Sequence, residues 1–259
     1  MSNEFAIPEG LRVYAIGDIH GYPDAFGTML DKIGRDLEDS PVADPVLITL
    51  GDYVDRGPDS RGVIERIVQI RHENKSFNFH NITGNHDHAF RCFLEEGDGN
   101  EDMALNFLYW GGIECLQSYG VRVPSFPSTP NALANLQDEA RHNVPDPHKT
   151  FLRNLQTYLQ IGDYLFVHAG IRPGFTLEEQ LFRDLVFIRE PFLFSEADHG
   201  FRVVHGHTIE PEPVVRHNRI GIDTGIFETG RLTCAVLEGT DLRFLHAFTD
   251  LPTGWRPPV

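Results

Sequence analysis

Three apolar runs early in the chain each lead into a loop that begins with glycine, and this repeated pattern most constrains the fold. The runs are Leu11–Ile16, Val46–Leu50 and Phe77–Ile82. Residues 22–33 and 61–70, which follow the first two loops, have the spacing of apolar residues that is typical of helices. This alternation of strand, loop and helix predicts parallel βαβ units and an α/β fold. In such sheets, ligands bind beyond the carboxyl ends of the strands.

The rest of the chain divides into a helical part and a strand-rich part. Residues 92–160 are polar, mostly helical in pattern and interrupted by prolines, so we expect a helical insertion within a single domain of residues 1–259. After residue 163 apolar runs return, and the short turns between some of them predict antiparallel pairs in a second sheet. These runs are Tyr164–Val167, Phe201–Val204, Val214–Arg216, Ile220–Asp223, Leu232–Leu237 and Leu242–Phe248.

Composition excludes several kinds of partner. Asp and Glu number 38 against 22 Lys and Arg, and the resulting charge of −16 disfavours binding to a nucleic-acid backbone. No run reaches the roughly 18 apolar residues of a membrane helix, and the N-terminus lacks the basic and apolar regions of a secretory signal. Three scattered cysteines, Cys92, Cys115 and Cys234, fit reduced thiols rather than a disulfide framework. We therefore expect a cytoplasmic protein without nucleic-acid or membrane partners.

The loops that follow the apolar runs carry side chains suited to metal binding. In chain order they read GDIHG (17–21), GDYVDRG (51–57), GNHD (84–87), VHAG (167–170) and VHGHT (204–208). Their carboxylate, imidazole and amide groups form the mixed oxygen and nitrogen set that manganese, iron or zinc accept. One Asp-x-His or Gly-Asn-His alone is weak evidence, since Asn and Gly are common in turns. Five such loops at strand ends indicate a metal site, and neither a P-loop nor a dinucleotide fingerprint explains them.

These five motifs, in this order, resemble the signature blocks of the calcineurin-like metallophosphoesterases. Within this superfamily, GDYVDRG resembles the corresponding motif of the phosphoprotein phosphatase branch, which includes bacterial serine/threonine phosphatases and symmetrical diadenosine tetraphosphate hydrolases. The resemblance spans residues 11–91 and 161–248, and the 92–160 insertion has no part in it. It implies a four-layer α/β/β/α sandwich of two mixed β-sheets flanked by helices.

The resemblance also implies two divalent metal ions, with manganese preferred and iron or zinc as alternatives. The implied ligands of the first ion are Asp18, His20 and Asp52, and those of the second are Asp52, Asn85, His168 and His207. Asp52 would bridge the ions, because the two oxygens of a carboxylate can span such a pair. His205 precedes His207 by two residues, and its role as a further ligand or a supporting group stays open.

Four further residues have implied catalytic roles. His86 has the position of the general acid, and Asp55 would accept a hydrogen bond from its ring and keep it charged. Arg56 and Arg189 would bind the phosphate oxygens, although Arg189 can also be read as a surface arginine beside Glu190. The implied reaction is direct attack of metal-activated hydroxide on phosphorus while His86 protonates the departing oxygen.

Two aspartates need separate comment. Protein phosphatases usually have glutamate where this chain has Asp87, while the wider superfamily commonly has aspartate. The difference weakens placement among the protein phosphatases and does not affect metal binding. Asp223, in a segment that resembles the closing strand–turn–strand of the family, is expected to stabilise a turn.

The sequence favours a phosphatase that acts on phosphoserine and phosphothreonine in proteins or on a small phosphomonoester. The alternative is a symmetrical dinucleoside polyphosphate hydrolase, which would cleave a P–O–P linkage at the same metal pair. A non-catalytic interaction module is the third reading, and the complete set of site residues argues against it. We expect substrate choice to depend on the insertion, where residues 109–112 (YWGG) could stack on a base, although aromatic residues are more often core residues.

Overall fold

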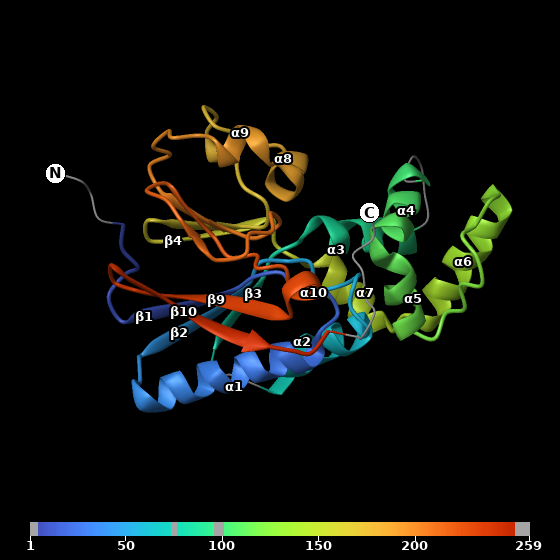
Figure 1. Ribbon diagram of the computed structural model, residues 1–259, viewed down its shortest axis with the longest axis horizontal. Helices are drawn as coiled ribbons and strands as arrows, with labels where there is room; N and C mark the ends of the chain where they lie inside the picture. The colour runs from blue at the N-terminus through green and yellow to red at the C-terminus, as the bar shows by residue number, and fades with distance from the viewer. Residues whose placement is uncertain (1–4, 74–76, 96–100, 252–259) are drawn as a thin grey trace.

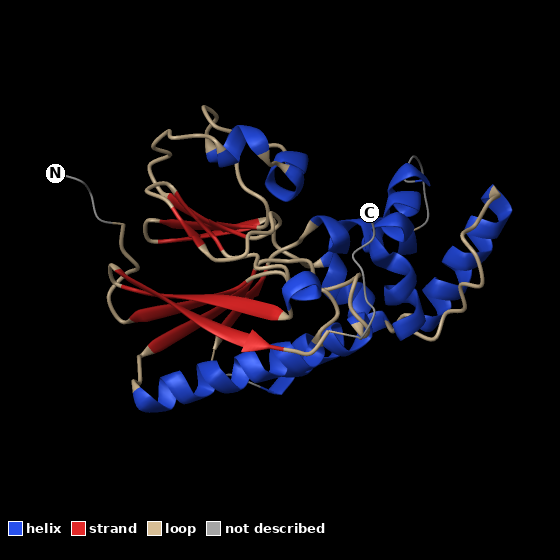
Figure 2. Ribbon diagram, viewed as in Figure 1, coloured by secondary structure: helices blue, strands red, loops and turns tan. Residues whose placement is uncertain are grey.

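Two five-stranded sheets stacked on each other form the centre of the molecule (Figure 1, Figure 2). The structure is a computed structural model that describes residues 5–73, 77–95 and 101–251. In spatial order the first sheet contains β10 (Asp241–Phe248), β9 (Arg231–Glu238), β1 (Leu11–Ile16), β2 (Asp44–Thr49) and β3 (Asn78–Asn81). The second contains β4 (Tyr158–Ile161), β5 (Tyr164–Val167), β6 (Arg202–His205), β8 (Arg219–Gly221) and β7 (Val214–Val215).

Both sheets are mixed: the first is parallel from β1 to its edge strand β3 and antiparallel on the side of β9 and β10, and the second is parallel in the middle and antiparallel at both edges. β1, β2 and β3 run parallel, as predicted, and α1 (Pro23–Asp39) and α2 (Ser60–Glu73) connect them. α1 begins with a proline, which suits the first turn of a helix, and it buries Phe26, Met29 and Ile33 on one face. β5, β6 and β8 form the parallel part of the second sheet. The carboxyl ends of these strands position the loops that carry the predicted site.

Helices cover the outer faces of both sheets, so the predicted four-layer α/β/β/α sandwich is confirmed. α1 and α2 lie on the first sheet, and α8 (Phe182–Phe187) and α9 (Glu190–Leu193) lie on the second, at the bottom and top of Figure 1. The core between the sheets is apolar and buried, and it includes Val13, Ile48, Phe166, Val204 and Ile220. Short elements η2 (Leu177–Glu179) and α10 (Ile226–Thr229) complete this part.

The predicted insertion is a helical lobe beside the sandwich, on the right of Figure 1. Its elements, which follow α3 (Asn85–Leu94), are α4 (Glu101–Phe107), the kinked turn η1 (Leu108–Gly112), α5 (Ile113–Ser118), α6 (Pro130–Asn143) and α7 (Asp146–Arg153). Phe107, Leu116 and Phe151 of the lobe belong to the same buried cluster as Tyr14 and Phe26. This shared core supports the proposal that the chain is a single domain.

Two details of the strand-rich part differ from the prediction. β9 and β10 belong to the first sheet, where β9 pairs with β1 from Val13↔Leu237 to Ile16↔Cys234. Nearly every residue of β9 is buried, so its pattern does not reveal which sheet it joins. β4 lies partly within the predicted helical insertion, and this four-residue edge strand with alternating exposure has too short a pattern to detect.

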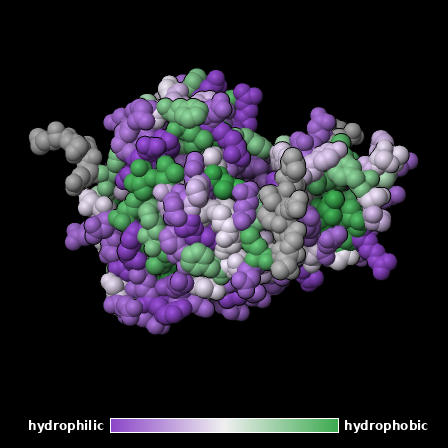
Figure 3. All heavy atoms as spheres, viewed as in Figure 1, coloured by the Kyte–Doolittle hydropathy of each residue, from purple (hydrophilic) through white to green (hydrophobic). Residues whose placement is uncertain are grey.

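Hydrophilic residues cover most of the face shown in Figure 3, and apolar patches are interspersed over the sheets and the helical lobe. Within residues 5–73, 77–95 and 101–251, no helix combines the length and apolar character that a membrane span requires.

Candidate metal centre

The loops that carry the predicted site residues meet at one end of the two sheets. Backbone hydrogen bonds join the loop after β1 to the loop after β2, since the N–H groups of Ile19 and His20 donate to the carbonyl of Asp52 at 3.0 and 2.8 Å. The loops after β5 and β6 are joined in the same way, where the N–H of Gly206 donates to the carbonyl of His168 at 2.8 Å. Backbone hydrogen bonds therefore fix the positions of loops that are distant in sequence relative to one another.

The backbone in these loops adopts conformations that side chains normally avoid. Among the described residues, the non-glycine residues with positive φ are His20, Asp52, Asp55, Arg56 and His207, with values between 44° and 71°. Such conformations cost free energy and persist where the surrounding structure holds them, most often at functional sites. All five belong to the predicted metal-binding and catalytic set.

Two glycines allow carboxylates to approach the backbone closely. A Cβ atom at Gly84 would lie 2.0 Å from Asp52 Oδ1, and one at Gly206 would lie 2.1 Å from Asp18 Oδ1. No side chain fits at either distance, so the glycines of the GNHD and GHT motifs make room for the aspartates of the first two loops.

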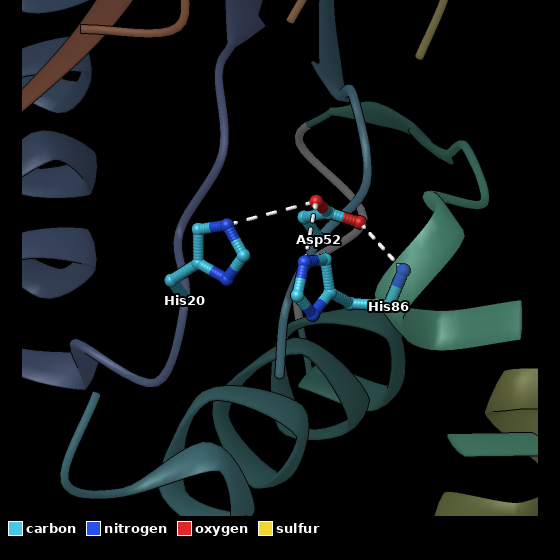
Figure 4. A group of neighbouring side chains, drawn as sticks. All are labelled: His20, Asp52 and His86. Carbon is cyan, nitrogen blue, oxygen red and sulfur yellow. Dashed lines mark hydrogen bonds and ion pairs between the residues drawn. The ribbon is translucent and has the colours of Figure 1, made fainter. Parts of the chain in front are cut away.

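Asp52 lies at the centre of the site. Its Oδ2 atom is 3.6 Å from His20 Nε2 and 3.9 Å from His86 Nε2, and both rings face the carboxylate in Figure 4. Its Oδ1 atom is 3.5 Å from His168 Nε2. In the part of the chain that the structure describes, the possible metal ligands form two groups, His20–Asp52–His86 and Asp52–His168–His207, and the ligand atoms within each group lie within 4.8 Å of one another. Asp52 belongs to both groups, the arrangement that a bridging carboxylate requires.

Two imidazoles are oriented by backbone carbonyls. His20 Nδ1 lies 2.9 Å from the carbonyl of Val54, and His168 Nδ1 lies 2.8 Å from that of Leu50. If each Nδ1 carries the proton and donates it, each Nε2 presents a free lone pair to the site.

The contact between His168 and Asn85 supports a cation at this position. Burial lowers the pKa of His168 to about 3, so its ring is neutral at pH 7. His168 Nε2 then faces Asn85 Oδ1 at 3.0 Å, and both atoms present lone pairs. A shared cation makes this contact favourable, so the donors in this part of the site fit a divalent metal ion.

Asp18 lies slightly apart from the two groups, beside Asp223. The N–H of His207 donates to Asp18 Oδ2 at 3.2 Å. Burial, and next the neighbouring Asp223, raise the pKa of Asp18 well above its usual value, and burial raises that of Asp223 to about 7. Adjacent buried carboxylates that resist ionisation indicate a position where bound cations would supply the missing positive charge.

The prediction that Asp223 stabilises a turn is confirmed, since its Oδ1 accepts a hydrogen bond from the N–H of Gly225 at 2.9 Å. Its position beside Asp18 is an additional feature that the sequence analysis missed. A signal existed, because Asp223 follows the end of β8 just as Asp18 follows β1.

His86 forms a buried pair with Asp55. His86 Nδ1 lies 2.7 Å from Asp55 Oδ2, as the predicted orienting role requires, and Nε2 faces the site. The pKa of His86 is lowered to about 4, mainly by burial; Asp52 opposes this shift, and Arg56 and Arg189 contribute to it. The ring is therefore neutral at pH 7 in the free protein, although it was expected to be kept charged. A bound anion would raise this pKa.

The two predicted phosphate-binding arginines are placed differently. Arg56 is partly buried, its guanidinium carbon lies 5.2 Å from the ring centroid of Phe227, and its buried Nε has no hydrogen-bond partner among the described residues. Arg189 is exposed at the N-cap of α9. It is near enough to the site to lower the pKa of His207, after the larger effects of burial and His168.

His205 does not join the metal-binding groups. Its ring packs against Phe192 with centroids 5.1 Å apart, and it lines a separate cavity of about 440 Å³ with Arg219 and Thr208 on the outer side of the second sheet. On a fully extended chain, side chains two residues apart would point to the same side of the strand. The positive φ of His207, 64°, ends that alternation and turns its ring into the site.

Asp87 has a role that sequence analysis missed. Its carboxylate is buried and accepts backbone hydrogen bonds from Asp52 at 2.7 Å, from Tyr53 at 2.9 Å and from Gly84 at 2.9 Å. It therefore holds the loop after β2 against the start of α3. No sequence signal distinguishes this function from an ordinary acidic residue in the first turn of a helix.

We expect Asp87→Ala to lower the free energy of unfolding by about 3–4 kcal/mol, because the change leaves three buried N–H groups without an acceptor. Urea denaturation monitored by circular dichroism measures this. Asp31→Ala, at an exposed aspartate of α1, is the matched control. A loss below about 1 kcal/mol for Asp87→Ala, the effect of an ordinary substitution, would contradict this role.

The profile of the calcineurin-like phosphoesterase family matches residues 11–227. A symmetrical bis(5'-nucleosyl)-tetraphosphatase of Acidovorax sp. strain JS42 is 31% identical over 175 residues, which are 66% of this chain. The match spans about half, 48%, of that relative's length. The asymmetrical bis(5'-nucleosyl)-tetraphosphatase PrpE of Oceanobacillus iheyensis is 25% identical over 243 residues, 86% of this chain and 87% of the relative.

A crystal structure of a protein proposed to be a diadenosine tetraphosphatase has the same fold, with a TM-score of 0.59 and 20% identity. The superposition covers 96% of this chain and 97% of the other. The family profile, which matches residues 11–227, shows that the chain belongs to the calcineurin-like phosphoesterase family, and the His/Asp groups that meet at Asp52 agree with this.

Proposed function

We propose that this protein hydrolyses dinucleoside polyphosphates. The observation that carries the substrate class is that a symmetrical and an asymmetrical bis(5'-nucleosyl)-tetraphosphatase, from different bacteria, are both similar to this chain. The phosphoprotein substrate favoured by the sequence has weaker support. Asp87 stands where protein phosphatases typically have a glutamate. A solved structure of a serine/threonine phosphatase from Saccharomyces cerevisiae is similar at a TM-score of 0.52 but only 15% identical, so this likeness concerns the fold alone.

The ligand set proposed for two divalent cations is that predicted from the sequence. Asp18, His20 and Asp52 would hold one, and Asp52, Asn85, His168 and His207 the other. When bound, the cations supply an activated water for attack on phosphorus and neutralise the phosphoryl oxygens. Manganese is the preferred identity, with iron or zinc as alternatives.

The remaining roles belong to side chains at the edge of the site. Arg56, whose buried Nε has no hydrogen-bond partner within the described part of the chain, would donate to a phosphate oxygen, and Arg189 would approach from the start of α9. His86 would transfer the proton on Nε2 to the departing phosphate oxygen while Asp55 holds Nδ1. The negative charge of the substrate raises the pKa of His86 and so favours its acid form in the complex.

The proposal is tested by assaying the purified protein on diadenosine tetraphosphate and, in parallel, on a phosphoserine peptide. We expect kcat/KM for the dinucleotide to exceed that for the peptide by at least about tenfold, the selectivity that one hydrophobic contact supplies. Chromatography of the products then gives the cleavage position, two ADP for symmetrical cleavage or ATP and AMP for asymmetrical cleavage. Turnover of the peptide without turnover of the dinucleotide would contradict the proposal and support a phosphoprotein substrate instead.

A further inference from the structure

The helical insertion contacts the catalytic loops through η1, where the chain kinks at Gly111. Gly111, within this turn, has a φ of 110°, and a Cβ atom on it would lie 2.7 Å from the backbone nitrogen of Arg56. The turn therefore packs directly on the backbone of the loop that carries Asp55 and Arg56.

Trp110 in this turn forms a wall next to the proposed general acid. The centroid of its ring lies 5.7 Å from that of His86 and 6.1 Å from that of Phe187 in α8. Trp110 and Phe187 are both partly exposed, whereas His86 is buried. Trp110 and Phe187 therefore present a partly exposed aromatic surface beside the buried pair of His86 and Asp55.

The position of Trp110 decides which part of a substrate it can meet. His86 would protonate the departing oxygen, so the group attached to that oxygen leaves on the side of His86. In a dinucleoside polyphosphate that group is a nucleotide, and its base offers an apolar face suited to stacking on tryptophan.

We propose that Trp110, supported by Phe187, is the stacking platform for the base of the leaving nucleotide. This subsite rests on the proposed function for its substrate class, and it deepens that proposal by giving the insertion a role in substrate choice. Neighbouring Tyr109 points elsewhere, since its ring packs on Phe126 with centroids 4.4 Å apart.

A fluorescence titration tests the contact without changing Trp110. The chain has two tryptophans, Trp110 and Trp255, so Trp255→Phe makes Trp110 the single reporter. With zinc in the buffer, we expect AMP to quench the emission of Trp110 and inorganic phosphate to leave it unchanged. Equal responses to AMP and phosphate, or no response to AMP, would overturn the proposal.

Inhibition of p-nitrophenyl phosphate hydrolysis separates stacking from a positioning role. We expect Trp110→Leu to raise the inhibition constant of AMP about tenfold, the effect of losing one aromatic stacking partner, and to keep that of inorganic phosphate within about twofold. Trp110→Phe should restore most of the affinity for AMP, and Tyr109→Ala, the matched control, should change neither constant. An equal loss for AMP and phosphate in Trp110→Leu would mean that Trp110 only positions His86, contrary to the proposal.

The same measurements distinguish failure of the subsite from failure of the proposed function. If diadenosine tetraphosphate is not cleaved but AMP still binds through Trp110, the proposed substrate is wrong and the base subsite stands. If the dinucleotide is cleaved but AMP neither quenches Trp110 nor binds more weakly to Trp110→Leu, the proposed substrate is supported and the base subsite is wrong.

Discussion

Replacing Asp52 with asparagine is expected to remove bound metal and to lower kcat by about 10³-fold or more. The carboxylate belongs to both groups of potential ligands, within 3.6 Å of His20 and 3.5 Å of His168. An amide keeps the size of the side chain but loses the negative charge and one acceptor oxygen. Metal-assisted stabilisation amounts to several kcal/mol, and each 1.4 kcal/mol corresponds to a tenfold change in rate.

Metal content by mass spectrometry and turnover of p-nitrophenyl phosphate should be measured on the same preparation, purified without chelator. Asp31→Asn, at an exposed aspartate, controls for the loss of one negative charge and should match the wild type in both measurements. Full occupancy of both ions together with a normal rate in Asp52→Asn would refute the bridging role.

The second large effect is expected for His86→Ala, and it should depend on the leaving group. A general acid contributes about 10²–10⁴-fold, so the loss in rate should reach this range for an alkyl phosphate, whose alkoxide leaving group needs a proton. The loss should be much smaller for p-nitrophenyl phosphate, because nitrophenolate leaves with little protonation. Asp55→Asn should give a weaker effect with the same dependence, since Asp55 acts through the hydrogen bond to His86 Nδ1.

The pH dependence provides a further readout for His86. Burial lowers its pKa to about 4 in the free protein, so the acid form diminishes as pH rises above that value. For an alkyl phosphate we expect the rate to fall on the alkaline side, with the midpoint shifted upward by the bound phosphate, and this limb to be absent in His86→Ala. His142→Ala, at an exposed histidine of α6, is the control. If His86→Ala lowers the rate equally for the alkyl phosphate and for p-nitrophenyl phosphate, His86 is not the general acid.

The amino-acid sequence alone determined the general nature of the site. Apolar runs that end at glycine-led loops indicate strand ends through local pattern, and the side chains in those loops indicate a metal site through their chemistry. Both signals are contained in segments of a few residues, so they need no knowledge of distant contacts. The choice of individual residues came from the resemblance of these loops to the family's motifs, which implied Asp18, His20, Asp52, His86 and His168, and the structure brings these side chains to the same end of the sheets.

Only the tertiary structure decided the features that depend on long-range pairing or on the sign of a backbone angle. β9 could be placed in the first sheet only from its pairing with β1, more than 200 residues earlier. His207, and not His205, enters the site because φ at His207 is positive. Asp87 joins two loops and Trp110 reaches His86 through contacts between segments that are separate in sequence. Short motifs carry the chemistry of ligands, whereas their arrangement depends on how the whole chain packs.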